Sequence, residues 1–281
     1  MDRSDTLNGS ASAAPRIAVV IPAHQGERTI SRSLGSIAEQ RWCGPLEVVV
    51  VCNGCRDATA ERAVEWQAAF ARRQWTLSVI ESPPGRIAAI NAGEAGVHPA
   101  AAVAIVDQDA CLGPDTLDAL ATVLHDGDRH FAAPTVRVRS VGGIVDRYYR
   151  AWQRLPYVVD SPVTIGCYAM SGVGRRRRGQ LPDGVPDDKF TRMRFTRAER
   201  AVTPRGSYEV IPPEGFTALL AARRRYRASN QALDRSCPGL GVRARRERLA
   251  GMASWACAPR HWIDGAVLVA VHVLARLPAR G

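Results

Sequence analysis

The feature that most constrains the fold is an alternation of strand-like and helix-like segments in the first half of the chain. Four short apolar, β-rich runs each precede a segment with apolar residues at helical spacing. The run 46–52 is apolar apart from Glu47, and such runs are typical of parallel strands covered on both faces. We therefore predict a doubly wound α/β fold with a mostly parallel sheet and right-handed crossovers. The predicted strands are 16–22, 46–52, 76–82 and 101–109, and the helices 29–40, 58–73, 86–97 and 113–126.

Ligands of such sheets bind beyond the carboxyl ends of the strands. The polar residues directly after each predicted strand therefore deserve the closest inspection, and we expect all four groups to face one crevice. They are Ala23 to Gln25, Asn53 to Asp57, Pro84 to Arg86, and Asp107 to Asp109.

The regular alternation ends near residue 130. The pattern beyond it predicts strands at 130–138 and 163–170 and a helix at 142–155. A Gly-, Pro- and Arg-rich stretch at 172–190 is predicted to be a long loop, and 214–233 a basic amphipathic helix. The apolar run 263–277 is too short to cross a bilayer and predicts a core or surface-docking helix.

A Cys-x-x-Cys pair, Cys52 and Cys55, follows the second strand and could belong to a zinc or redox site. Zinc would need two further ligands at suitable spacing, and the chain has no second such pair. The seven cysteines, together with an N-terminus lacking the apolar run of a signal peptide, favour reduced thiols in a cytosol. We interpret the pair as part of the loop at the lip of the crevice.

Two pairs of carboxylates could carry chemistry. Asp107 and Asp109 leave a buried strand one residue apart, and hard oxygen ligands of this kind suit Mg²⁺ or Mn²⁺. The alternative is a solvated turn that caps the next helix. Asp187 and Asp188 are adjacent, so repulsion raises one pKa and makes that group a candidate base. The alternative for that pair is an exposed helix cap.

The chain carries a formal net charge of +11, and Lys189 is the single lysine. An arginine-rich surface is compatible with nucleic acid, an anionic membrane or phosphorylated ligands. Arg86 opens a predicted helix, where a cation and free N–H groups together favour an anion. The runs 175–178 and 223–227 could bind such anions or form a solvated face.

The order of these motifs resembles that of family 2 glycosyltransferases of GT-A fold over about residues 16–235. The stretches that carry the resemblance are "VVIPAHQGERTI", "VVVVCNGCRDAT", "GRIAAINAG", "VDQDA", "PDDKF" and "RRRYR". It implies three parts: a tail at 1–15 that we expect to be disordered, a catalytic domain at 16–235 and a helical extension at 236–281. The domain would comprise a nucleotide-binding half, 16–128, and an acceptor half, 129–235.

The resemblance also implies roles for individual residues. Donor binding would involve Pro22, Ala23, His24, Asn53, Asp57, Arg86, Asp107, Arg225 and Arg227. The metal, Mg²⁺ or Mn²⁺, would be held by Asp107 and Asp109, and the base would be Asp188, beside Asp187.

Two departures from the family pattern limit this assignment. Cys52 and Asn53 replace the usual acid pair, which leaves the donor's base open. "RRRYR" replaces a Gln-x-x-Arg-Trp motif of chain-building members, which favours a single transfer.

The resemblance implies an inverting, non-processive transfer of a sugar from a nucleoside diphosphate to a hydroxyl of a glycan, a lipid-linked compound or a small molecule. We expect a cytoplasmic enzyme, with peripheral contact to an anionic membrane at its inner face. A nucleotidyltransferase is an alternative, although it usually has a glycine-rich loop after the first strand. A nucleic-acid-binding protein is another, but it leaves four aspartates unexplained, so we expect no nucleic acid.

Overall fold

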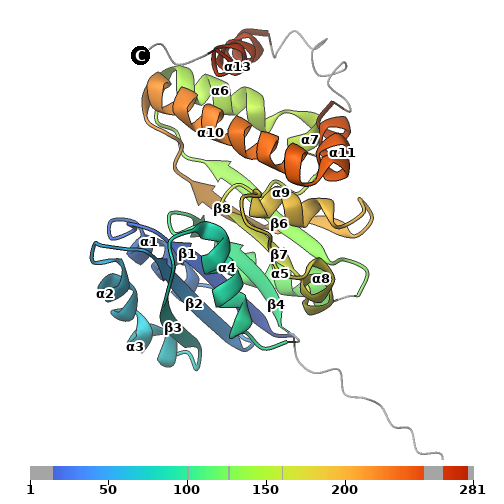
Figure 1. Ribbon diagram of the computed structural model, residues 1–281. Coiled ribbons are helices and arrows are strands. Elements are labelled where there is room, and N and C mark those ends of the chain that lie inside the picture. The colour runs from blue at the N-terminus through green and yellow to red at the C-terminus, as the bar shows by residue number, and fades with distance from the viewer. Residues whose placement is uncertain (1–14, 100, 126, 160, 250–261, 278–281) are drawn as a thin grey trace, which may run out of the picture.

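The computed structural model describes residues 15–99, 101–125, 127–159, 161–249 and 262–277. Its centre is an eight-stranded mixed sheet flanked by helices (Figure 1). The strands are β1 (Ile17–Ala23), β2 (Leu46–Asn53), β3 (Thr76–Ser82), β4 (Ala102–Val106), β5 (Cys111–Leu112), β6 (Phe131–Val138), β7 (Cys167–Met170) and β8 (Arg200–Val210). The helices described are α1 (Ile30–Ala38), α2 (Thr59–Val64), α3 (Gln67–Ala71), α4 (Arg86–Ala95), α5 (Thr116–His125), α6 (Gly143–Gln153), α7 (Pro156–Val159), α8 (Gly172–Arg178), α9 (Asp187–Met193), α10 (Gly215–Ser236), α11 (Pro238–Leu249) and α13 (Trp262–Leu274).

The strand order is β3-β2-β1-β4-β7-β6-β8-β5. The first four strands pair in parallel, with Ala23 opposite Cys52 and Ile17 opposite Ala102. Strand β7 runs antiparallel to both β4 and β6, and β8 is parallel to β6. The predicted α/β fold with a mostly parallel sheet is thus confirmed. One sheet continues through the boundary drawn at residue 128.

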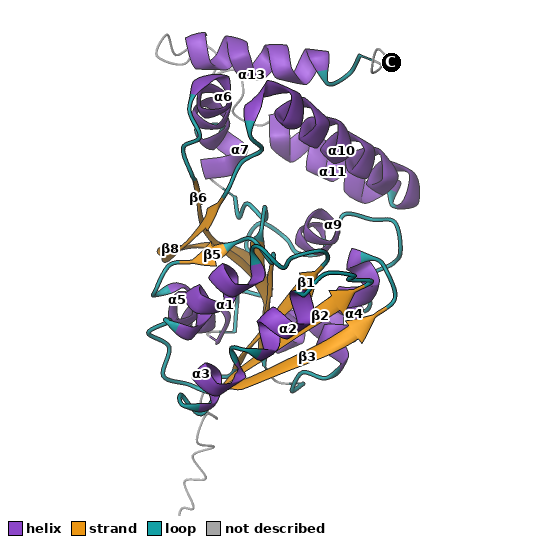
Figure 2. Cartoon of the chain, turned by 90° about the vertical axis from the view of Figure 1, so that its left-hand side faces the viewer, coloured by secondary structure: helices purple, strands orange, loops and turns teal. Residues whose placement is uncertain are grey.

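Apolar side chains on the two faces of the sheet form two cores. Alternate residues of β1 divide between them: Ile17, Val19 and Ile21 face one core, and Ala18 and Val20 the other. Helices α1 and α5 cover the first core and α4 covers the second. Figure 2 shows a further layer in which α6, α10, α11 and α13 lie together beyond one end of the sheet, with α9 between that layer and the strands.

The loop predicted at 172–190 is partly wrong, because it contains α8 and the start of α9. Ser171 caps α8 by accepting a hydrogen bond from the Gly174 N–H, and the four arginines that follow are good helix formers. The helix predicted at 58–73 is broken into α2 and α3. Strand β8 was not predicted, since its many polar residues hide the alternation.

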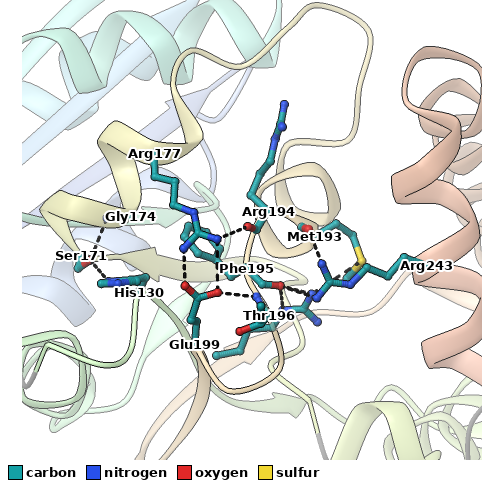
Figure 3. Close-up of polar contacts among 11 residues, drawn as sticks. His130, Ser171, Gly174, Arg177, Met193, Arg194, Phe195, Thr196, Glu199 and Arg243 are labelled. Carbon is teal, nitrogen blue, oxygen red and sulfur yellow. Dashed lines mark hydrogen bonds and ion pairs between the residues drawn. The ribbon is translucent and has the colours of Figure 1, made fainter.

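A polar cluster ties α11 to the turn that follows α9 (Figure 3). The Phe195 carbonyl accepts hydrogen bonds from Arg200 Nη2 at 2.7 Å and from Arg243 Nη2 at 2.8 Å. Glu199 pairs with Arg177 of α8 and accepts from the Thr196 N–H at 2.7 Å. Because this turn directly follows α9, the cluster fixes the helix that carries Asp187 and Asp188.

Within the described residues, no helix combines the length and apolarity needed to cross a bilayer.

Candidate active site

The loops after β1, β2 and β4 are held together by hydrogen bonds. The His24 N–H donates to Gln108 Oε1 at 2.7 Å, and Gln108 Nε2 donates to the His24 carbonyl at 3.1 Å. His24 Nδ1 lies 2.8 Å from the Asn53 carbonyl oxygen. These bonds bring three of the four strand ends together, and the expectation that all four groups face one crevice stays a prediction.

The buried side chain of Asn53, at the end of β2, connects the end of β1 to the loop after β3. Its Nδ2 donates to the Ala23 carbonyl at 2.7 Å, and its Oδ1 accepts from the Gly85 N–H at 3.3 Å. Both ends of the amide are thus occupied by the backbone, and Pro22 and Ala23 are buried in β1 beside it. The geometry gives Asn53 a positioning role next to the crevice.

Asp57 joins the first two loops. One carboxylate oxygen accepts from the Glu27 N–H at 3.1 Å, and the other from the Thr59 hydroxyl and N–H. These bonds, above all the one from the Thr59 hydroxyl, lower the pKa of Asp57. Asp57 is therefore an ionised link that holds the first loop against the second.

Arg86 bridges two carboxylates that come from distant parts of the chain. Its Nη2 lies 2.7 Å from Asp107 Oδ1, and its Nε donates to Asp187 Oδ1 at 2.8 Å. The Tyr168 hydroxyl donates to Asp187 Oδ2 at 3.0 Å, and the Asp187 side chain is only 7% exposed. Both oxygens of Asp187 are thus engaged, which makes it a structural anchor for α9.

Asp188 is held differently from its neighbour. Thr164 Oγ1 donates to its Oδ2 at 2.7 Å, and the Lys189 backbone N–H also stabilises the ionised carboxylate. Burial, and secondarily the Asp187 charge, raise the pKa of Asp188 above its ordinary value. A carboxylate with a raised pKa that lines a cavity is suited to accept a proton near neutral pH.

Two cavities meet at Asp188. One, of about 590 Å³, runs from Arg86 and Asp107 past Gly184 to Asp188. The other, of about 660 Å³, runs from Asp188 to α13. Both are lined by Thr164, Ile165, Asp188, Lys189, Tyr226 and Asn230. Two ligands, one in each cavity, would therefore meet at the Asp188 carboxylate.

Asp107 and Asp109 follow β4, as predicted. Asp109 is exposed as a whole residue, yet surrounding protein atoms partly desolvate its carboxylate, and this desolvation, followed by the Asp107 charge, raises its pKa. The described residues contain no cluster of three or more His, Cys, Asp or Glu side chains able to hold a metal. Two hard carboxylates nevertheless fit Mg²⁺ or Mn²⁺, because such ions commonly take their remaining ligands from phosphates and water.

The arginines of the segment 223–227 differ in whether they line a cavity. Arg227 lines the second cavity, whereas Arg225 is exposed and lines neither. Arg223, which sequence reasoning did not single out, also lines that cavity. Its Nη1 donates to the Tyr148 hydroxyl at 3.2 Å, and its guanidinium carbon lies 4.3 Å from the centre of the Tyr226 ring. In the sequence Arg223 is one arginine in a run of arginines. Its contacts with Tyr148 and Tyr226, which appear only in the folded structure, set it apart.

The cysteine pair lies at the lip of the crevice. Cys52 is buried in β2, and this burial is the main cause that raises the pKa of its thiol to about 12. Cys55 Sγ lies 3.4 Å from the Ala23 carbonyl oxygen. A protonated, buried thiol is a poor metal ligand and a poor nucleophile.

Comparison with known proteins agrees with this geometry. Residues 15–224 match the sequence family described as "Glycosyltransferase like family 2". The chain belongs to that family, and its fold is the GT-A fold of glycosyltransferases. Among curated proteins, none matches the sequence significantly.

Solved structures similar to this one include those of three proteins. The mannosyltransferase PcManGT from Pyrobaculum calidifontis, in complex with GDP-Man and Mn²⁺, has a TM-score of 0.63 at 21% identity, covering 93% of this chain and 86% of its own. Glucosyl-3-phosphoglycerate synthase from Mycobacterium tuberculosis, with Mn²⁺, UDP and glucosyl-3-phosphoglycerate, has a TM-score of 0.54 at 21% identity, covering 81% of each chain. S. aureus TarS has a TM-score of 0.55 at 16% identity over 75% of this chain, which spans only 38% of TarS. At these identities the likeness establishes the fold.

Proposed function

We propose that the chain transfers a sugar from a nucleoside diphosphate sugar to an acceptor hydroxyl, with inversion at the anomeric carbon. The observation that carries the proposal is the meeting of two cavities at Asp188, one beside the strand-end carboxylates and the other beside α10. A single displacement needs the donor, the acceptor and a base at one point. This arrangement supplies such a point.

In the proposed reaction the donor diphosphate lies in the cavity lined by Arg86 and Asp107. The acceptor oxygen attacks the anomeric carbon, the bond to the diphosphate oxygen breaks, and the acceptor proton passes to the Asp188 carboxylate. Arg86 stabilises the charge that develops on the leaving diphosphate, an electrostatic contribution from a preorganised group. Asp107 and Asp109 would hold the divalent cation, which supplies further neutralisation of that charge when bound.

The roles proposed for the other residues follow from their positions. His24, Asn53 and Asp57 order the loops that face the donor's nucleoside. Arg227 lies on the acceptor side. Two of the similar structures contain Mn²⁺ together with GDP-Man or UDP, which supports a divalent cation and a nucleotide-linked donor here. The protein would act in the cytoplasm.

The second cavity favours an acceptor that carries negative charge. Five cationic side chains line it, against two carboxylates, Asp188 and Asp234. The cations are Lys189, Arg192, Arg223, Arg227 and Arg276. Excess positive charge in a partly enclosed space is unfavourable until an anion binds, so a phosphate or carboxylate group on the acceptor would be stabilised there.

The test is to incubate the protein with Mn²⁺, a panel of nucleoside diphosphate sugars and hydroxyl compounds in matched neutral and phosphorylated pairs, and to analyse the products by mass spectrometry. A glycosylated product whose anomeric configuration is opposite to that of the donor, determined by NMR, would support the proposal. A product of retained configuration would refute the single displacement. Transfer of a nucleotidyl group instead would refute the sugar transfer itself.

A further inference from the structure

Helix α13 forms the outer edge of the helical layer (Figure 1). Apolar side chains along one side of it are left uncovered by the rest of the described chain. Its opposite face packs on α6 and α10, through Gly265, Leu268 and Val271. The exposed residues recur every three or four positions, so they share one side of the helix. The apolar ones are Trp262, Ile263, Ala266, Val269, Ala270, Val273 and Leu274, with Leu277 exposed just beyond the end of the helix.

The exposure is large for apolar side chains. Ile263 is 71% exposed, Trp262 63% and Val269 55%. Single exposed apolar residues are ordinary on protein surfaces, but a contiguous stripe of this kind marks an interaction surface.

Arginines flank the stripe at both ends. Arg147 and Arg150 of α6, and Arg154 directly after it, place nitrogens 3.7, 2.9 and 3.8 Å from the carboxylate of one residue, Asp264. Three cations against one anion leave two net positive charges at the start of α13. At its end, Arg276 is exposed, and Arg224 Nη2 lies 3.5 Å from the Leu277 carbonyl oxygen.

We propose that this face of α13 docks on a membrane surface that contains anionic lipids. An apolar helix face with a tryptophan at one end and arginines at its borders matches the pattern of a helix that lies in the interface of a bilayer. The apolar side chains enter the acyl boundary while the arginines remain at the level of the lipid phosphates. This inference does not depend on the proposed reaction.

A second copy of the chain is the competing occupant, and the charges disfavour it. In a two-fold symmetric dimer through this face, the same patch meets itself. The arginines at the borders of one copy would then lie close to those of the other, and like charges across an interface are unfavourable. A bilayer with anionic lipids supplies the opposite charge instead. His272, Ala275 and Arg276 also line the second cavity, which runs from Asp188 to α13. A docked chain would therefore hold that cavity close to the bilayer.

The experiment uses the full chain and vesicles either of phosphatidylcholine alone or of equal parts phosphatidylcholine and phosphatidylglycerol. Wild-type protein is expected to co-sediment with the anionic vesicles and to be released by salt. A variant with Ile263→Gln, Val269→Gln and Val273→Gln should bind them at least about tenfold more weakly, since each change removes buried apolar area. The matched control replaces valines exposed elsewhere, Val64→Gln and Val173→Gln, and should bind as wild type does.

Three results would overturn the proposal. They are equal binding by the wild type and the α13 variant, no binding of the wild type to the anionic vesicles, and a dimer in light scattering that the α13 variant converts to a monomer. Should the triple variant fail to fold, as judged by circular dichroism, the single variants Val269→Gln and Val273→Gln provide the same comparison.

Discussion

Replacing Asp188 with asparagine tests the proposed base directly. The change is nearly isosteric. The amide oxygen can keep the hydrogen bond from the Thr164 hydroxyl that holds the carboxylate at 2.7 Å. The amide nitrogen would then face the acceptor, where it cannot accept a proton. Loss of a general base costs about 10²- to 10⁴-fold in rate, or about 3 to 5 kcal/mol of transition-state stabilisation.

The expected result is therefore a collapse of kcat with little change in donor affinity. Donor binding is measured by titration calorimetry and kcat by release of the nucleoside diphosphate. Asp187→Asn is the matched control, because it removes a neighbouring carboxylate that already binds Arg86 and Tyr168. That variant should lower kcat less and weaken donor binding more. If Asp188→Asn retains more than about a tenth of the wild-type kcat, Asp188 is not the base.

The pH dependence adds an independent check. Because burial raises the pKa of Asp188, the acidic limb of the wild-type kcat profile should lie above the ordinary aspartate value. A raised pKa means that the folded state favours the protonated carboxyl, so this contribution to stability is present at low pH and lost as the pH rises through the folded pKa. Asp188→Asn should thus unfold at the same temperature as wild type or higher at neutral pH. A large loss of stability would show that the carboxylate is structural.

The remaining predictions concern the metal, the acceptor and the cysteines. Asp109→Asn should abolish turnover in the presence of Mn²⁺ without lowering the melting temperature, and full wild-type activity in excess EDTA would contradict the metal role of Asp107 and Asp109. Arg227→Gln with Arg276→Gln should raise the KM of a phosphorylated acceptor by about tenfold or more while leaving donor KM unchanged. Arg235→Gln removes one positive charge from an exposed position of α10 outside both cavities, and should leave both constants at their wild-type values. Cys52→Ala with Cys55→Ser should lower activity only modestly and leave zinc absent in elemental analysis, whereas Asn53→Ala should raise donor KM more. Stoichiometric zinc in the wild-type protein would reverse the interpretation of that loop.

Strands β1, β2 and β4 were predictable because they are largely buried on both faces. Each therefore appears in the sequence as a mostly apolar run, with Glu47 of β2 as the exception, whereas the edge strand β3 is more exposed. The same signal placed Asp107 and Asp109 at a strand end. The proposed role of Asp188 came instead from the order of motifs shared with family 2 glycosyltransferases, since the periodicity of the sequence does not indicate it.

The second half was less predictable, because pairing there depends on contacts between distant residues. Strand β8 alternates irregularly and includes a register shift opposite Pro134 and Thr135. The arginine run 175–178 looks like a solvated face, yet Arg178 is buried in an ion pair with Glu94 of α4. Nothing local to the run indicates that partner, which lies more than 80 residues away. For the same reason the sequence could not show that Arg86 would bridge Asp107 and Asp187.

Lys189 sits in the wall shared by both cavities, 9% exposed, with its Nζ donating to Asn230 Oδ1 at 2.7 Å. It is also the only side-chain amine in the chain. A reagent that acylates primary amines therefore has two targets, the amino terminus and a single atom next to the proposed base. The rate at which Lys189 is labelled would report how often α9 and α10 separate, because the Lys189 amine bonds to Asn230 of α10. Slower labelling of Lys189 in the presence of a compound would show that the compound occupies one of the two cavities, before any turnover is measured.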